Sequence, residues 1–238
     1  HCSIRTSYDQ PYDKPRNYIR ISYPDDAGIK ESKPGIVNLM YVEDEMKFAL
    51  VSTIRPAVRK IAVEAIRGFP DKWDKAIVVN GQPLSEATYG AIREAGEEGG
   101  VMLKSDGGKL AIHELSRNFA DTGKLSDRVV FFISSFESIG SSWKTAEPWQ
   151  MGIVLVDPII YLRKCAAGGG KIERGFEFRS RFDQAKNRLY DPKLVEIEDM
   201  FTLLAGNLAI QALCGDLGDQ ESMSGLAKRV RSSFKLSS

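Results

Sequence analysis

The sequence predicts an α+β fold, in which hairpins build a mixed or antiparallel sheet and three or four helices pack against it. Short β-prone runs separated by turn signals recur along the chain, whereas helical periodicity is confined to a few segments in irregular order. With 238 residues, 42% hydrophobic and 27% charged, the chain is long enough to bury a sizeable core and too apolar to be a disordered chain. We expect one α+β domain over residues 36–222, an arm over residues 1–35 and a basic tail over residues 223–238.

The first elements are predicted from alternation and from apolar spacing. Tyr18–Tyr23, within the arm, alternates as a short strand does. Ile36–Val42 and Met46–Thr53 are β-prone and flank an acidic turn, which favours a hairpin, although a continuous helix from this turn onward is the alternative. Residues 56–67 begin with a proline and repeat apolar side chains at helical spacing, which predicts a helix with a basic outer face.

The middle of the chain alternates between strands and one further helix. Ala76–Asn80 is predicted as a short strand that ends in a turn, and Ser85 is the expected N-cap of a helix through about Ala95. Val101–Leu115 contains a Ser-Asp-Gly-Gly turn between two β-prone runs and is predicted as a hairpin. Arg128–Phe136 and Gln150–Val156 are apolar enough to be buried strands.

The last third contains the longest predicted helix. Ile159–Lys164 is ambiguous between strand and helix, and Gly168–Gly170 breaks the chain after it. With Asp191 as N-cap and Gly215 as the stop, residues 192–214 are predicted as one long apolar helix. Two adjacent apolar stripes on this helix predict that it is a central core helix or a subunit interface.

Composition and charge exclude several classes of protein. Lys and Arg number 33 against 32 Asp and Glu, a net charge of +1 without the excess typical of a protein that coats nucleic acid. Three cysteines without CxxC spacing and two histidines argue against a disulfide framework and a zinc site, and we predict neither a metal nor a cofactor. No run reaches the roughly 18 to 20 apolar residues of a spanning helix, and no apolar signal region is visible. We therefore expect a protein of the cytoplasm or another reducing compartment.

The charges are segregated along the chain. Residues 163–188 hold eight basic and three acidic side chains, residues 191–222 hold one basic and seven acidic ones, and residues 223–238 hold four basic and no acidic ones. If the basic stretches converge in the fold, they form a face that binds nucleic acid or an anionic surface. The predicted anion-binding residues are Arg55, Arg59, Lys60, Lys171, Arg174, Arg179, Arg181, Lys228, Arg229 and Arg231.

The leading functional hypothesis is a non-enzymatic, self-associating protein that uses this basic face on nucleic acid or an anionic surface. Blocks of opposite charge favour ordered self-association, and a viral structural, nucleocapsid or matrix role fits this profile. The alternative is that the arginines are simply solvated. The predicted interface residues are Trp143 and Trp149 in a loop, with Phe201, Leu204 and Leu208 on the long helix.

Two other functions stay open. One is a small cytosolic enzyme with its pocket near the Cys165–Lys171 loop, where neighbouring basic residues would lower the pKa of Cys165 and His113 is the available imidazole. The glycines of this loop could also cradle a phosphate, although the spacing of a P-loop is absent. The other is a scaffold domain that binds a protein partner through the loop with the two tryptophans.

Overall fold

The computed structural model describes residues 3–9, 16–22, 34–55, 60–70, 77–79, 81–103, 105–106, 109–121, 125–140, 150–180 and 193–214. Over these ranges the fold is α+β, with a mixed sheet and three helices, as the sequence predicts. None of the three helices is both long and apolar enough to span a membrane. Of the predicted arm (1–35), two paired strands and residues 34 and 35 are described, and the predicted tail (223–238) lies outside the described residues.

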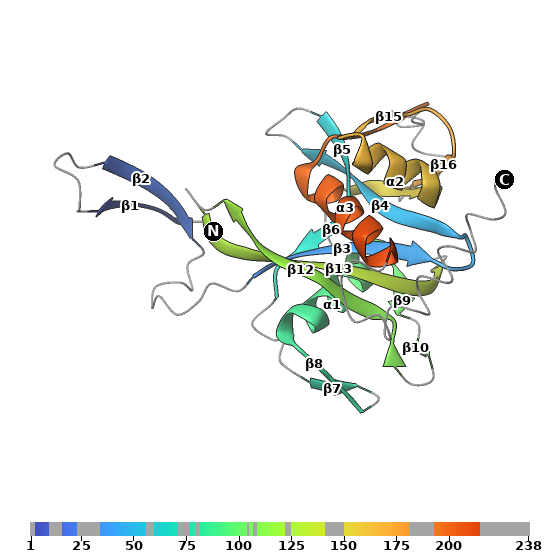
Figure 1. Ribbon diagram of the computed structural model, residues 1–238, viewed down its shortest axis with the longest axis horizontal. Helices are drawn as coiled ribbons and strands as arrows, with labels where there is room; N and C mark the ends of the chain where they lie inside the picture. Colours follow the sequence, from blue (N-terminus) through green and yellow to red (C-terminus); the bar gives the residue numbers. More distant parts are fainter. Residues whose placement is uncertain are drawn as a thin grey trace.

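A nine-stranded sheet forms the centre of the molecule (Figure 1). Its main path runs β12 (Ile112–Asp121), β13 (Leu125–Ile139), β3 (Gly35–Val42), β4 (Lys47–Arg55), β14 (Gln150–Val156) and β16 (Phe176–Ser180). Off this path, β5 (Lys60–Glu64) pairs with β4, β6 (Ile66–Gly68) pairs with β3, and β9 (Val101–Leu103) pairs with β13. The β3–β13 pair is parallel and the other pairs are antiparallel.

Helices cover both faces of this sheet. Helix α1 (Glu86–Gly99) packs on one face, while α2 (Pro158–Ala166) and α3 (Met200–Cys214) pack on the other (Figure 1). The remaining strands form small antiparallel pairs: β1 (Ser3–Asp9) with β2 (Arg16–Ser22), β7 (Ile77–Val79) with β8 (Gln82–Leu84), β10 (Ser105–Asp106) with β11 (Lys109–Leu110), and β15 (Gly170–Ile172) with β17 (Val195–Ile197). The central strands are buried on both sides, which agrees with their continuous apolar character.

The sheet opens between β3 and β4. These strands pair with each other only near their turn, from Met40 opposite Ala49 to Val42 opposite Lys47. Beyond this point the segment from Lys60 to Gly68 enters the gap, first along β4 and then along β3. Ala65 lies between β5 and β6, and its N–H donates to Oγ1 of Thr202 at the start of α3 (2.8 Å). A side chain from the covering helix thus satisfies a buried backbone donor at the crossing.

Several elements are confirmed because short-range signals specify them. The β3–β4 hairpin, β13 and β14 lie where the apolar runs predict them. Helix α1 begins after Ser85, whose hydroxyl accepts the Thr88 N–H, and ends at Gly100, which has a left-handed φ of 62°. The ambiguous segment after residue 157 is helix α2, capped by Asp157. The hairpin predicted over 101–115 is shorter than expected: Ser105–Asp106 pairs with Lys109–Leu110 across the predicted turn, whereas Val101–Leu103 pairs with β13.

Two predicted helices are wrong. In place of the helix over residues 56–67, residues 60–64 and 66–68 are strands, because pairing with β4 and β3 outweighs helical spacing in a segment rich in β-branched side chains. The long helix over 192–214 is also wrong. Val195–Ile197 pairs with β15, and α3 begins only at Met200, capped by Asp199 rather than Asp191. Asp191 and Pro192 lie outside the described residues.

Gly206 lies in close contact with α2, and it supplies a test of the packing between α2 and α3. A Cβ at Gly206 would overlap Sγ and Cβ of Cys165, so Gly206→Ala should lower the free energy of unfolding by about 1–3 kcal/mol. Gly96→Ala in α1 is the matched control, because its Cβ would meet only the Val101 carbonyl at 3.9 Å. We expect Gly96→Ala to be neutral or to stabilise by up to about 1 kcal/mol. Urea unfolding measures both, and equal effects would contradict the helix–helix contact.

Candidate functional site

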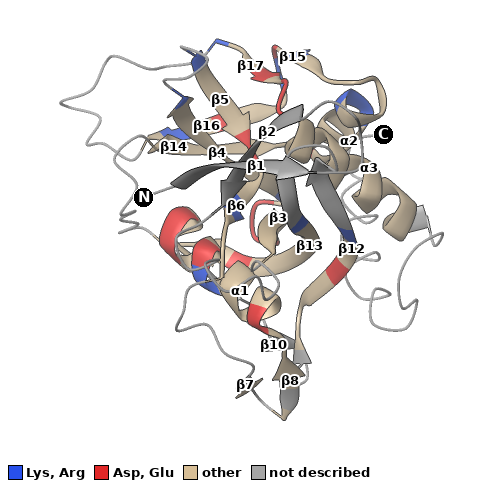
Figure 2. Cartoon of the chain, turned by 90° about the vertical axis from the view of Figure 1, so that its left-hand side faces the viewer, with Lys and Arg blue, Asp and Glu red and all other residues tan. Residues whose placement is uncertain are grey.

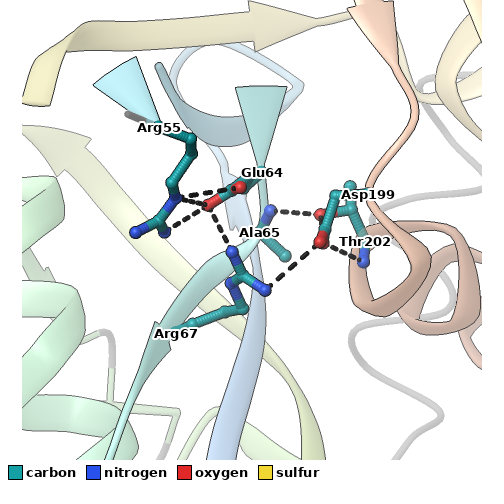
Figure 3. A network of polar contacts seen from close by, with 6 residues as sticks. All are labelled: Arg55, Glu64, Ala65, Arg67, Asp199 and Thr202. Atoms are coloured by element: carbon teal, nitrogen blue, oxygen red, sulfur yellow. Dashed lines mark hydrogen bonds and ion pairs between the residues drawn. The ribbon is translucent and has the colours of Figure 1, made fainter. Parts of the chain in front are cut away.

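A buried carboxylate lies at the opening of the sheet. Glu64, the last residue of β5, is only 3% exposed and faces two arginines (Figure 3). Nε of Arg55, at the end of β4, donates to both carboxylate oxygens at 3.1 Å, and its Nη2 contacts Oε2. Nη2 of Arg67 on β6 lies 2.7 Å from the same Oε2. The two guanidinium groups therefore neutralise one carboxylate together, and both contact its Oε2.

This pairing keeps Glu64 ionised within the protein. Burial opposes ionisation, but hydrogen bonds and charges from Arg55 and Arg67 outweigh it and hold the pKa of Glu64 below its usual value. Without these arginines, a carboxylate at this depth would favour its protonated form. Glu64 is thus a fixed negative charge that orients two cations.

Arg67 is held on its second side by the start of α3. Its Nη1 lies 3.2 Å from Oδ1 of Asp199, and its guanidinium carbon lies 5.6 Å from the centre of the Phe201 ring. The other carboxylate oxygen of Asp199 accepts the Thr202 N–H at 2.8 Å and the Thr202 hydroxyl at 2.7 Å. The same hydroxyl oxygen accepts the Ala65 N–H, so the helix cap and the crossing strand belong to one network (Figure 3).

Arg55 is less completely engaged. Its partner among the described residues is Glu64, and its side chain is 43% exposed. The hydrogen bond and charge of Glu64 raise the pKa of Arg55, and the more distant charges of Glu98 and Asp199 add to this effect. Part of the Arg55 guanidinium is therefore accessible to a ligand from solvent, next to negative charges of the chain.

Acidic side chains of α1 adjoin the same opening. Glu94, Glu97 and Glu98 are spaced i, i+3 and i+4, and acidic residues recur along this helix (Figure 2). A Cβ at Gly68 of β6 would overlap the Glu94 carboxyl, so Glu94 lies directly against the crossing strand. Arg93 pairs with Glu94 (2.9 Å) and Glu97 (2.8 Å). The opening thus combines carboxylates from α1 and β5 with arginines from β4 and β6.

The environment of Glu94 differs from that of Glu64. Burial is the main influence on Glu94 and raises its pKa, and the pairing with Arg93 offsets this only in part. A carboxylate whose pKa is raised accepts a proton more readily than an ordinary one. Within the described ranges, no three His, Cys, Asp or Glu side chains are close enough to hold a metal ion among themselves.

Of the ten cations predicted to bind anions, five lie within the described residues, and three of these pair with carboxylates. Arg55 is the last residue of β4, at the end that points away from the β3–β4 turn. Arg179 on β16 pairs with Glu177 and with Glu45, and Glu45 lies in that turn. Lys60 pairs with Glu198 at 3.0 Å. Lys171 and Arg174 are exposed in the chain after α2, without an ion pair among the described residues. Arg59, Arg181, Lys228, Arg229 and Arg231 lie outside the described residues, and binding of nucleic acid or an anionic surface stays a prediction.

The setting predicted for Cys165 is wrong. The side chain is 1% exposed in the contact between α2 and α3, and burial raises the pKa of its thiol to about 11, although neighbouring basic residues were expected to lower it. His113 lies on β12 opposite Ile133 and is half-buried.

The glycine loop after Cys165 has a structural role at the end of α2. The N–H groups of Gly168 and Gly169 donate to the carbonyl oxygens of Cys165 (3.0 Å) and Lys164 (2.8 Å). They close the C-terminal end of α2 and are not available to a phosphate.

The predicted interface residues divide into two groups. Leu208 is buried in the core of the chain itself, and Phe201 and Leu204 pack half-buried against that core. Trp143 and Trp149 lie outside the described residues. Self-association and a partner of the tryptophan loop therefore stay predictions.

The sequence predicted Arg55 as an anion-binding residue but did not predict which residues surround it. Glu64, Arg67 and Asp199 come together only in the folded chain. Glu64 and Arg67 were assigned to a helix that the protein does not form, and Asp199 was placed inside a helix that it in fact caps. Glu94, Glu97 and Glu98 share one side of α1, but the predicted helix ended at about Ala95 and left Glu97 and Glu98 outside it.

Comparison with known proteins gives no family. No family model matches the chain, and no curated protein matches it. One solved structure, described as the crystal structure of an ADP compounds hydrolase, is similar over 90% of this chain and 95% of its own, with 12% sequence identity and a TM-score of 0.47. At this identity and TM-score we take neither a fold family nor an activity from it.

Stability as a function of pH tests the Glu64 network. Because the folded pKa of Glu64 lies below its unfolded value of about 4.3, its ion pairs stabilise the fold above that pH, and this contribution is lost as the pH falls through the folded pKa. Glu64→Gln should cost about 2 kcal/mol at pH 7, less than a fully buried pair, because Arg55 reaches solvent. In urea unfolding from pH 7 to pH 3, wild type and variant should converge below about pH 4.3; parallel curves would contradict the assignment.

Alkylation kinetics test the burial of Cys165. In a variant with Cys2 and Cys214 replaced by Ser, we expect iodoacetamide to modify native Cys165 at pH 8 about 100-fold more slowly than the unfolded chain, because its pKa is about 11. Mass spectrometry of the native and guanidinium-unfolded protein gives both rates. Equal rates would restore Cys165 as a candidate nucleophile.

Proposed function

We propose that this protein is a hydrolase that cleaves a phosphoanhydride with the help of a divalent cation, at the opening between β3 and β4. The observation that supports the proposal most directly is the partly exposed Arg55, held by Glu64 and placed within the field of Glu98 on α1. A cation donor for phosphate and carboxylates that can hold a metal ion are the two kinds of group that phosphoryl transfer requires. This departs from the sequence-based expectation of a non-enzymatic protein without a metal.

A carboxylate of α1 is the kind of ligand that a hard cation takes. Mg²⁺ prefers carboxylate oxygens and is commonly held by one or two carboxylates, with water and substrate phosphates filling its other positions. Glu98 of α1, whose charge acts on Arg55, is the residue that would hold it, with water and substrate phosphates in the other positions. When bound, such an ion neutralises charge on the phosphates and activates water.

The other residues would divide the remaining roles. Arg55 would bind a substrate phosphate through the N–H donors that Glu64 does not occupy. Glu94, whose pKa burial raises, would accept the proton of the attacking water. The oxygen of that water forms a bond to one phosphorus, the bond from that phosphorus to the bridging oxygen breaks, and the leaving phosphate takes the electron pair.

Hydrolysis assays with and without Mg²⁺ test this proposal. The panel should contain nucleoside di- and triphosphates and diphosphates that link a nucleoside to a second group. We expect turnover of at least one phosphoanhydride that EDTA abolishes. Glu98→Gln should lower kcat/KM about 100-fold, because it removes a charged metal ligand.

The matched control is Glu173→Gln, which neutralises an exposed carboxylate between β15 and β16. It should leave kcat/KM unchanged. The proposal fails if Mg²⁺ promotes hydrolysis of none of these substrates, or if Glu98→Gln and Glu173→Gln behave alike.

A further inference from the structure

Asp199 joins two structures that are far apart in the sequence. It is the N-cap of α3 through its contact with the Thr202 N–H, and it is also an ion-pair partner of Arg67 on β6. Each carboxylate oxygen has its own partner, since Oδ2 accepts from Thr202 and Oδ1 faces Arg67. The side chain of Asp199 is 15% exposed, so both contacts are largely shielded from solvent.

The contacts of Arg67 determine how Glu64 can move. Oε2 of Glu64 is shared by Arg55 and Arg67, whereas Oε1 accepts only from Nε of Arg55 among the described residues. If Arg67 were free to rotate, it could bind both oxygens of Glu64 and displace Arg55. Asp199 on one side and the Phe201 ring against its guanidinium keep Arg67 turned, so that it reaches a single oxygen.

We propose that Asp199 is a positioning residue of the candidate site: through Arg67 it fixes Glu64, and thereby the orientation in which Arg55 meets a phosphate. The inference rests on the proposed function for its effect on substrate, although the positioning of Arg67 does not. Asp199 touches no reacting group in this arrangement and acts only through the chain Arg67–Glu64–Arg55 (Figure 3).

Asp199→Asn removes the negative charge of residue 199 but keeps its function as the N-cap of α3. Asn caps a helix about as well as Asp, so α3 keeps its start, while Arg67 loses one of its two carboxylates. Since Arg55 holds phosphate in the ground state and in the transition state alike, its misplacement weakens uniform binding. We expect KM for the phosphoanhydride substrate to rise about tenfold, as for the loss of one charge-assisted hydrogen bond, with kcat within about twofold of wild type.

Asp157→Asn is the matched control. Asp157 caps α2 by accepting the N–H groups of Ile159 and Ile160, and it has no arginine partner among the described residues. The same chemical change should therefore leave KM and kcat unchanged. Equal KM values for the two variants would overturn the positioning role.

A second measurement is independent of activity. In ¹⁵N spectra of the side chains, the guanidinium group of Arg67 should rotate slowly in wild type and in Asp157→Asn, and clearly faster in Asp199→Asn. Unchanged rotation in Asp199→Asn overturns the inference even if substrate is turned over. If wild type hydrolyses nothing, the proposed function fails, but the Arg67 signals still decide the positioning.

If Asp199→Asn does not fold, Arg67→Lys tests the same ion pair by changing its other member. Lysine keeps the positive charge but cannot span Glu64 and Asp199 with a planar fork. It should raise KM by a similar factor without changing kcat, and an unchanged KM would overturn the inference.

Discussion

Glu64 is an ionised carboxylate in the interior of this protein, at the opening of the central sheet, and its negative charge has to be neutralised by neighbouring groups. A buried charge without partners costs several kcal/mol or takes up a proton. Two arginines from β4 and β6 supply the compensation, and Arg67 in turn is held by the cap of α3. The crossing of β5 into β6, the start of α3 and the orientation of both arginines therefore depend on one charge.

The two arginines around Glu64 have different roles, because they are satisfied to different degrees. Arg67 contacts two carboxylates and an aromatic ring, and its side chain is 26% exposed. Arg55 has one carboxylate partner in the described part of the chain and reaches solvent beside the acidic helix α1. Arg67 can thus serve to neutralise the buried charge of Glu64, while Arg55 beside it can also recognise an anion.

Elements specified by neighbouring residues could be predicted, and elements specified by distant pairing could not. The β3–β4 hairpin and the Ser85 cap of α1 are confirmed, since alternation and capping act over a few residues. Residues 60–68 have apolar spacing that suits a helix in isolation, and only the free edges of β3 and β4 draw them into strands. The charge of Arg55 indicated an anion site, but its partner Glu64 had been placed on a helix that does not exist.

By itself the sequence determined the α+β class, the central strands and α1, because hydrophobic periodicity and caps are local properties. The tertiary structure decided which cations are neutralised and which face solvent, because an ion pair depends on distance in space and not along the chain. Arg55 and Arg179, both basic in the sequence, end at opposite ends of the hairpin, each beside a different carboxylate. Burial likewise raises the pKa of Cys165, whereas the sequence predicted that it would be lowered. The helix that covers the thiol comes from a segment about 40 residues further along the chain.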